Sequence, residues 1–222
     1  MQMQEADVWN FLLKNWLAIL AASFISYLVG SVSFSVMFTK MTSKRDIRTM
    51  GSKNAGFTNV LRSVGKAPAI FTLLCDFLKG VLAIFLSMLV FFLIMGKASS
   101  ELPNLVYYVA GFFCVVGHVF PCFFGFRGGK GVLTGAAVVM MANWPIFIAL
   151  VWIFVLALAF SKIVSLSSIT AAAFLPILTL FYSPGPCYVD FLFSFLISVL
   201  IVLKHKANIA RIVKKEEKRI FR

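Results

Sequence analysis

The charged residues of this chain are separated by long gaps, and these gaps constrain the fold more than any other feature. Twenty-five uncharged residues lie between Lys14 and Lys40, and another 25 lie between Glu101 and Arg127. A helix needs about 20 apolar residues to cross the hydrocarbon core of a bilayer. Only 13% of the 222 residues are charged, whereas a soluble domain usually carries about 25%. The chain is therefore expected to be all-α, a polytopic membrane helix bundle.

Two longer uncharged stretches are each expected to divide into two helices. The 31 residues after Lys130 would form one helix of about 46 Å at a rise of about 1.5 Å per residue, so a turn at Asn-Trp-Pro, residues 143–145, is expected instead. The 41 residues after Lys162 contain one charge and the turn signal Ser-Pro-Gly-Pro at 183–186. With the apolar stretch that follows Lys66, the count is seven transmembrane helices.

The positive residues indicate how these helices are oriented, because cytoplasmic loops carry an excess of Lys and Arg. In a seven-span arrangement 19 of the 21 positive residues fall on one side, and only Lys14 and Lys97 fall on the other. An even number of spans would scatter them over both faces. The sequence therefore predicts the N-terminus outside and the C-terminus in the cytoplasm. It predicts one membrane domain, 1–204, followed by a basic segment, 205–222, although the helix near 131–143 is short for a full crossing.

Polar residues gather in four motifs, all at the expected cytoplasmic ends of helices. The first, GSKNAGFTNVLRSVGK, runs from Gly51 to Lys66. If a helix starts near Ala55, Thr58 and Arg62 share one of its faces. Backbone N–H groups at a helix start, with an arginine one turn later, suit a phosphate. An ordinary basic loop that only sets topology is the alternative.

The second motif, GHVFPCFFGFRGGKG, ends in residues that suit an anion. Gly128, Gly129 and Gly131 can form a concavity of backbone N–H groups with the Lys130 ammonium at its rim. The spacing differs from that of a P-loop, which argues against ATP. His118 in the same motif fits either a buried core histidine or a catalytic base.

The third motif, SKIVSLSSI, runs from Ser161 to Ile169. It places Ser165, Ser167 and Ser168 at the start of a helix. Hydroxyl groups there cap the first turn or hydrogen-bond an anion. Capping alone would also explain the cluster.

The fourth motif is the basic C-terminal segment. Within it, His205 and Asn208 are three residues apart and share a helix face. The basic residues beyond them suit an anionic leaflet. A polybasic tail without a catalytic role would look similar, apart from these two residues.

Asp76 and Lys79 lie three residues apart within an otherwise apolar stretch. Ionisable residues inside membrane spans are functional or mutually paired. A structural ion pair is the favoured interpretation.

In their order and spacing, these motifs closely resemble the bacterial acyl-phosphate:glycerol-3-phosphate acyltransferases, the PlsY family. The resemblance runs from Gly30 to about Ile209, through GSVSFSVMFTK, the first motif, DFLKG, the second and third motifs, and HKANI. The usual family pattern has other residues at four positions, Ser33, Lys53, Phe57 and Ala207. None of these departures removes a residue with an expected direct role.

The resemblance implies a site at the cytoplasmic face of a multi-pass protein of the bacterial cytoplasmic (inner) membrane. It implies an acyl-phosphate donor and a glycerol-3-phosphate acceptor. The products would be lysophosphatidate and inorganic phosphate, in the first acylation step of phospholipid synthesis. The residues implied as catalytic are Ser52, Arg62, Lys130 and His205. Those implied as substrate-binding are Asn54, Thr58, Asn59, Gly128, Gly129, Gly131, Ser165, Ser167, Ser168 and Asn208.

An acyl phosphate is already activated, so the protein needs to position it and stabilise charge rather than supply a covalent nucleophile. The proton of the acceptor hydroxyl goes either to His205 or to a phosphate oxygen of the substrate. The resemblance favours the phosphate oxygen.

Other classes of protein fit the sequence less well. The HxxxxD motif of another lipid-acyltransferase type is absent, since Phe123 and Ala210 stand where its Asp would follow His118 and His205. An anion or phosphate transporter is the main alternative, but transporters place their site near the membrane midplane. A scaffold leaves the polar motifs unexplained.

Nucleic-acid binding is not expected, because the aromatic residues lie in the apolar runs and not between the basic clusters. The four cysteines have no close metal-ligand spacing, and no nucleotide motif is present. The sequence therefore predicts no metal site and no cofactor, with membrane lipids as the surroundings.

Overall fold

The computed structural model describes residues 5–96, 104–182 and 188–220, and this part of the chain contains helices and no strands. The helices are α1 (Glu5–Lys14), α2 (Trp16–Gly30), α3 (Phe34–Ser43), η1 (Ile47–Thr49), α4 (Phe57–Ser63), α5 (Lys66–Met95), α6 (Asn104–Val119), η3 (Cys122–Phe124), α7 (Val132–Ala142), α8 (Trp144–Ser161), α9 (Val164–Tyr182), α10 (Tyr188–Lys204) and α11 (Lys206–Val213). The expected turn at 183–186 and Lys97 lie outside the described residues.

Every predicted apolar segment contains a helix, but length supports fewer than seven crossings. Five helical segments are long and apolar enough to cross a membrane, namely Trp16–Ser43, Lys66–Met95, Val106–Phe124, Trp144–Ser161 and Val164–Tyr182. α10 and α11 together give a sixth candidate that bends by 58°. α7 has only 11 residues, as the short stretch near 131–143 led us to expect.

The predicted break in the fourth apolar stretch is confirmed. α7 ends at Ala142 and α8 begins at Trp144. The Asn143 side chain caps α8, because its Oδ1 accepts a hydrogen bond of 3.2 Å from the N–H of Ile146. Pro145 follows in the first turn, where a missing N–H leaves no helical hydrogen bond unmade.

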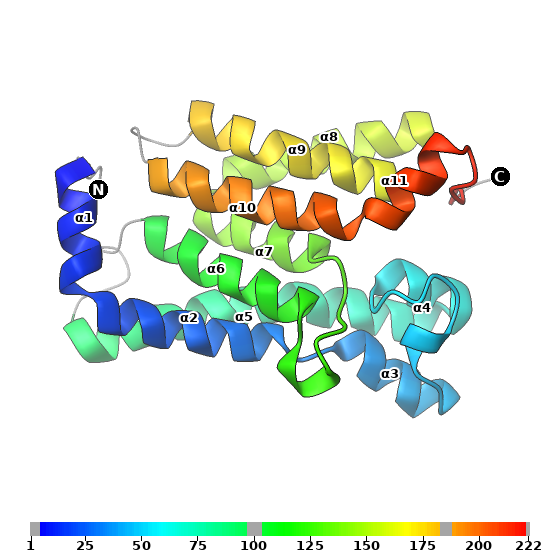
Figure 1. Ribbon diagram of the computed structural model, residues 1–222, viewed down its shortest axis with the longest axis horizontal. Coiled ribbons are helices and arrows are strands. Elements are labelled where there is room, and N and C mark those ends of the chain that lie inside the picture. Colours follow the sequence, from blue (N-terminus) through cyan, green and yellow to red (C-terminus); the bar gives the residue numbers. More distant parts are fainter. Residues whose placement is uncertain (1–4, 97–103, 183–187, 221–222) are drawn as a thin grey trace.

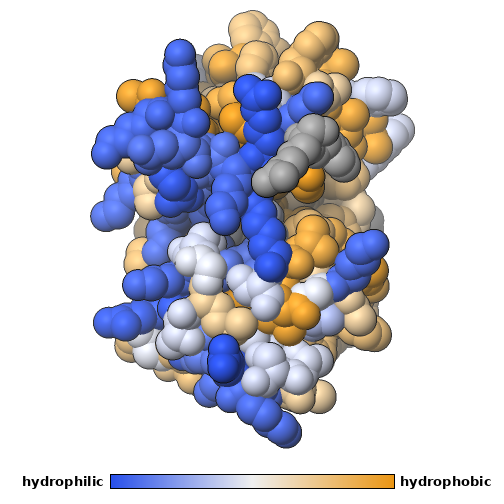
Figure 2. Space-filling view, turned by 90° about the vertical axis from the view of Figure 1, so that its right-hand side faces the viewer, coloured by the Kyte–Doolittle hydropathy of each residue, from blue (hydrophilic) through white to orange (hydrophobic). Residues whose placement is uncertain are grey.

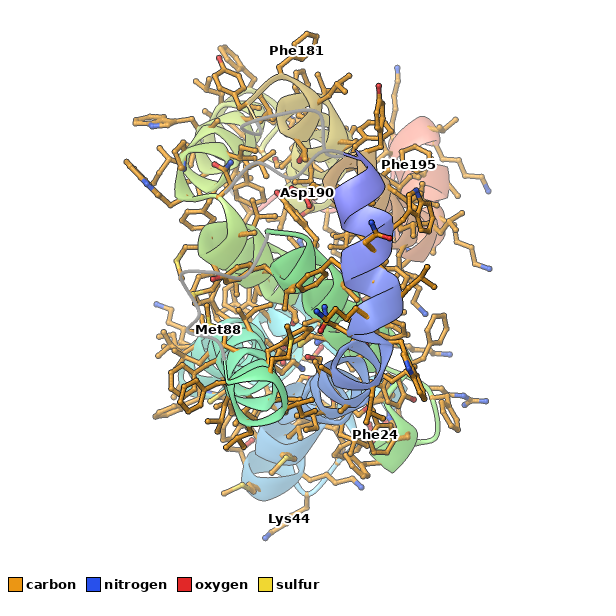
Figure 3. All side chains as sticks on the ribbon, turned by 90° about the vertical axis from the view of Figure 1, so that its left-hand side faces the viewer. Phe24, Lys44, Met88, Phe181, Asp190 and Phe195 are labelled. Carbon is orange, nitrogen blue, oxygen red and sulfur yellow. The ribbon has the colours of Figure 1, made fainter. Side chains whose placement is uncertain are left out.

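The outer surface of the bundle is apolar. Figure 3 looks along the bundle from the end that carries α1 and shows side chains, Phe24 and Phe181 among them, projecting outward around the helices. Phe160 on α8 is 88% exposed. Large exposed aromatic side chains around long apolar helices are suited to lipid and not to water. The protein is therefore a multi-pass membrane protein.

Small residues allow the helices to pack closely. A Cβ atom added to Gly117 on α6 would lie 2.2 Å from the carbonyl oxygen of Tyr27 on α2. One added to Gly30 on α2 would lie 2.1 Å from the carbonyl oxygen of Cys114. Glycines at such contacts let two helix backbones approach without a clash.

The two ends of the bundle carry different segments of the chain (Figure 1). The N-terminus and α1 lie at one end, whereas α4, α11 and the C-terminus lie at the other, which we call the α11 end. Figure 2 faces the α11 end, and hydrophilic residues gather over much of it while apolar residues lie toward the sides. The motifs predicted from the sequence belong to this end.

Candidate active site

A cavity of about 420 Å³ is lined at the α11 end by residues of all four motifs. The predicted site residues that line it are Ser52, Asn54, Thr58, Asn59, Arg62, Lys130, Gly131, Ser165, Ser168, His205 and Asn208. Gly128, Gly129 and Ser167 do not line it. The Ser167 hydroxyl instead donates a 3.0 Å hydrogen bond to the Ile163 carbonyl. Segments far apart in the sequence therefore meet at one cavity.

Asn59 organises the first motif. Its Nδ2 donates hydrogen bonds to the carbonyl oxygens of Met50 and Asn54, each 3.0 Å long. Its Oδ1 accepts one of 3.0 Å from the Ser52 N–H. A Cβ atom on Gly51, whose φ is +53°, would lie 2.3 Å from the same Oδ1. This side chain thus folds the loop that presents Ser52, and only glycine fits beside it.

α4 carries the cationic part of this motif. It begins at Phe57, and Thr58 and Arg62 both line the cavity, as their spacing predicted. The Arg62 guanidinium is near the C-terminal segment, since its Nη2 donates a 3.3 Å hydrogen bond to the Lys218 carbonyl.

The glycine loop of the second motif is held by backbone hydrogen bonds. The N–H groups of Gly128 and Gly129 donate to the carbonyls of Val119 and His118, at 3.2 and 3.1 Å. In this structure protein carbonyls already accept from these two amides, so an anion-binding concavity at Gly128 and Gly129 stays a prediction. The loop delivers Lys130 to the start of α7, where the first turn of a helix leaves N–H groups without helical partners.

Lys130 is a partly buried cation of the cavity. Its Nζ donates a 2.6 Å hydrogen bond to Asn208 Oδ1. Burial lowers the pKa of Lys130 to about 8, although the Glu217 carboxylate opposes this shift. An ammonium that has lost its water gains strongly from a phosphate, which would replace that hydration.

Glu217 and Arg211 also line the cavity, and the sequence analysis missed both. Glu217 Oε1 accepts hydrogen bonds of 2.6 Å from Asn208 Nδ2 and 2.8 Å from Ser165 Oγ. Its Oε2 lies 2.5 Å from Arg211 Nε. Burial alone would raise the pKa of Glu217, but these three hydrogen bonds and the Arg211 charge together lower it below its usual value. We call Lys130, Asn208, Glu217, Arg211 and Ser165 the mouth network.

His205 is buried between α10 and α11 and lines the cavity. Its Nδ1 is 2.8 Å from the Ile201 carbonyl oxygen, which only accepts hydrogen bonds. Nδ1 therefore carries the proton in the neutral ring, and Nε2 is left as an acceptor. This tautomer has the lone pair that a base requires.

Charge in the cavity is strongly unbalanced. Lys130, Arg62 and Arg211 contribute three positive charges, and Glu217 contributes one negative charge to the same region. Asp76 and His118 also line the cavity wall, but Asp76 is paired with Lys79 at 2.8 Å. The mouth therefore retains an excess of positive charge that favours anions.

Deeper in the cavity the lining becomes apolar. Side chains from α5, α7, α8, α9 and α10 form this part, including Leu150, Phe154, Leu175 and Ile197. Among the residues that the structure describes, no three His, Cys, Asp or Glu side chains are grouped to hold a metal ion. The site is thus a cationic mouth joined to an apolar groove in a membrane protein.

An integral-membrane helix bundle whose cationic cavity continues into an apolar groove belongs to the class of membrane proteins suited to ligands with an anionic head and an apolar chain. Residues 20–215 match the family model described as glycerol-3-phosphate acyltransferase. The chain therefore belongs to the glycerol-3-phosphate acyltransferase family, and the predicted resemblance to PlsY is confirmed.

Individual relatives agree. The glycerol-3-phosphate acyltransferase of Prochlorococcus marinus (strain MIT 9215) is 37% identical over 197 residues, which cover 89% of this chain and 95% of the relative. The one from Bartonella henselae (strain Houston 1) is 36% identical over 223 residues, covering 98% and 97%.

Crystal structures of PlsY, described as an integral membrane glycerol 3-phosphate acyltransferase, share the fold. The glycerol 3-phosphate form has a TM-score of 0.77 and 31% identity and covers 91% of this chain and 95% of its own. The lysophosphatidic acid form has a TM-score of 0.74 and 30% identity, covering 90% and 94%. The protein is thus an acyltransferase, and the transporter alternative is set aside.

Proposed function

We propose that the protein transfers a fatty acyl group from an acyl phosphate to glycerol-3-phosphate and releases lysophosphatidate and inorganic phosphate. The observation that carries this proposal is the single cavity with a cationic mouth and an apolar interior. Both substrates bear phosphate, and the donor also bears an acyl chain. The mouth suits the two phosphates, and the groove suits the chain.

In the proposed reaction the glycerol hydroxyl oxygen attacks the carbonyl carbon of the acyl phosphate. The new carbon–oxygen ester bond forms, and the bond from that carbon to the phosphate oxygen breaks. Lys130 and the first N–H groups of α7 stabilise the negative charge on the departing phosphate. Arg62 and Ser52 from the first motif, with Asn208, hold the acceptor phosphate and glycerol backbone.

The hydroxyl proton passes to a phosphate oxygen of the substrate in this proposal. His205 is the alternative acceptor, because its Nε2 lone pair belongs to a side chain that lines the same cavity. A modest loss of activity in His205→Ala together with a severe loss in Lys130→Ala supports the phosphate oxygen. The reverse ranking supports His205 as the base.

We further propose seven crossings of the bacterial inner membrane, with α7 as the shortest, the N-terminus outside and the C-terminus in the cytoplasm. Termini at opposite ends of the bundle support an odd number of spans (Figure 1). The excess of Lys and Arg in the segments of the α11 end supports a cytoplasmic site.

The test uses purified protein in lipid, glycerol-3-phosphate and palmitoyl phosphate, with phosphate release and lipid product both measured. We expect release that requires both substrates and forms lysophosphatidate in equal amount. Release without glycerol-3-phosphate would indicate a phosphatase and overturn the proposal. Lys66→Ala is the matched control for Lys130→Ala, since Lys66 is an exposed cation at the same end of the bundle.

A further inference from the structure

The apolar groove has a defined depth. Five side chains of α8 line it, and among them Leu158 is nearest the mouth and Phe147 is deepest. Leu158 and Phe147 are 11 residues apart, which at a helical rise of about 1.5 Å per residue is about 16 Å. An extended alkyl chain with carbon–carbon bonds of about 1.5 Å advances about 1.3 Å per carbon, so about a dozen carbons fit along this length.

Packed side chains close the deep end. The Phe147 ring on α8 contacts the Phe77 ring on α5, with centroids 6.3 Å apart and planes inclined by 54°. Phe147 also packs against a core cluster that includes the fully buried side chains of Val139 and Ile197. The aromatic pair thus joins α5 and α8 at the far end of the groove, and members of the core cluster form part of the groove wall there.

One side of the groove also faces the lipid. Val151 lines the cavity and is nevertheless 40% exposed on the lipid-facing side of α8. An acyl chain that left the groove beside Val151 would enter lipid. Its length beyond that point would not affect binding. An acyl chain that instead continued along α8, away from the mouth, would meet Phe147. The two routes predict different dependence on chain length.

We infer that Phe147 sets the acyl-chain length that the enzyme prefers, by ending the groove at its contact with Phe77. This rests on the proposed acyl-phosphate donor. A donor that is too short leaves part of the apolar groove unfilled, which costs contact and burial. A donor that is too long must displace a ring held between two helices. Phe147 is therefore a specificity-determining residue and does not act at the reacting atoms.

The experiment compares Phe147→Ala with Phe154→Ala. Both residues are half-buried phenylalanines that line the groove from the same face of α8, seven residues apart, so the chemical change is matched and only the depth differs. Glycerol-3-phosphate-dependent phosphate release is measured with dodecanoyl, myristoyl, palmitoyl and stearoyl phosphates. The readout is the ratio of kcat/KM values between donors within each variant, which does not depend on the folded fraction.

We expect Phe147→Ala to raise the ratio for a donor two carbons longer than the wild-type optimum by about tenfold, the range expected for a few methylenes in an apolar pocket. Phe154→Ala should lower activity with all donors and leave their ranking unchanged. Leu150→Phe, which adds volume one turn from Phe147, should shift the optimum to shorter chains.

Three outcomes are distinguishable from one another. No acyl transfer by the wild-type protein with any donor would overturn the proposed function and the inference with it. Active wild type with the same ranking in Phe147→Ala would overturn only the inference and favour exit beside Val151. Equal shifts in Phe147→Ala and Phe154→Ala would show that overall width, and not the deep end, sets the preference.

Discussion

Two ionic clusters in this molecule, one buried and one partly exposed, use the same kinds of residue and have different consequences. The first is the wall pair, Asp76 and Lys79, whose side chains are each 2% exposed and whose charged atoms are 2.8 Å apart. The second is the mouth network around Glu217. The wall pair comes from one turn of α5, whereas the mouth network joins the start of α7, the start of α9, α11 and the C-terminal tail.

The difference lies in the balance of charge and hydrogen bonds. In the wall pair one ammonium meets one carboxylate, and the ammonium also donates a 2.8 Å hydrogen bond to the Val32 carbonyl. The mouth network has one carboxylate against Lys130 and Arg211, with Arg62 close by. A neutralised pair fixes the arrangement of helices, while a cluster with excess positive charge is left to attract anions.

The largest expected effect comes from breaking the wall pair. Asp76→Asn leaves the Lys79 ammonium buried without a counter-charge, and we expect the free energy of unfolding to fall by about 3–5 kcal/mol. Chemical denaturation in detergent micelles, followed by tryptophan fluorescence, measures this loss. The double variant Asp76→Asn/Lys79→Gln should recover most of the stability. Equal instability of the single and double variants would contradict the role of charge.

Removing the central cation of the mouth should affect catalysis instead of stability. We expect Lys130→Ala to lower kcat/KM by about 100- to 1000-fold, the cost of losing one donor that stabilises developing charge. Its free energy of unfolding should not fall, because a partly desolvated ammonium is costly to the folded state. A variant that unfolds in parallel with its loss of activity would place Lys130 with the wall pair.

Breaking the mouth network at its carboxylate should have an intermediate effect. In Glu217→Gln, Asn208 and Arg211 lose a charged hydrogen-bond partner, and such bonds contribute about 1.5–3 kcal/mol each. We expect kcat/KM to fall about tenfold, since Asn208 Oδ1 is no longer held toward Lys130. Glu216→Gln is the control, because Glu216 is the exposed neighbour. Equal effects of the two variants would mean that only the charge of the tail matters.

The wall pair and the helices around it were predictable because their causes are local. Charge gaps located the long helices, the Asn-Trp-Pro break at 143–145 placed the start of α8, and a three-residue spacing paired Asp76 with Lys79. Each of these follows from residues within a few turns of one another. The family resemblance was also carried by short motifs.

The mouth network was only partly predictable because its contacts are nonlocal. Glu216 and Glu217 are equivalent in the sequence, yet only Glu217 reaches the cavity, because the tail turns back after α11. The backbone acceptors of Gly128 and Gly129 were not foreseen for a similar reason, since they lie nine and eleven residues earlier in the chain, at Val119 and His118. The pair of acids, Glu216 and Glu217, in an otherwise basic tail was the available signal, and it did not distinguish the two.

The sharpest test of the contrast needs no substitution and no large effect near neutral pH, because it is the pH dependence of kcat/KM. Lys130 has a pKa of about 8, and phosphate monoesters lose their second proton near pH 6. Below about pH 6 the substrate has less negative charge, and above about pH 8 the empty site loses the ammonium. kcat/KM should therefore be highest between these values and fall about tenfold for each pH unit well above 8.

Bound phosphate stabilises the ammonium, so the upper limb for kcat should lie at higher pH than the limb for kcat/KM. Lys130→Arg tests whether deprotonation of Lys130 causes the upper limb, because a guanidinium stays charged throughout this pH range. Its upper limb should disappear even if its activity is lower. If the loss of kcat/KM at high pH persists in Lys130→Arg, another group titrates. Lys130 would then not be the titrating charge that distinguishes the mouth network from the wall pair.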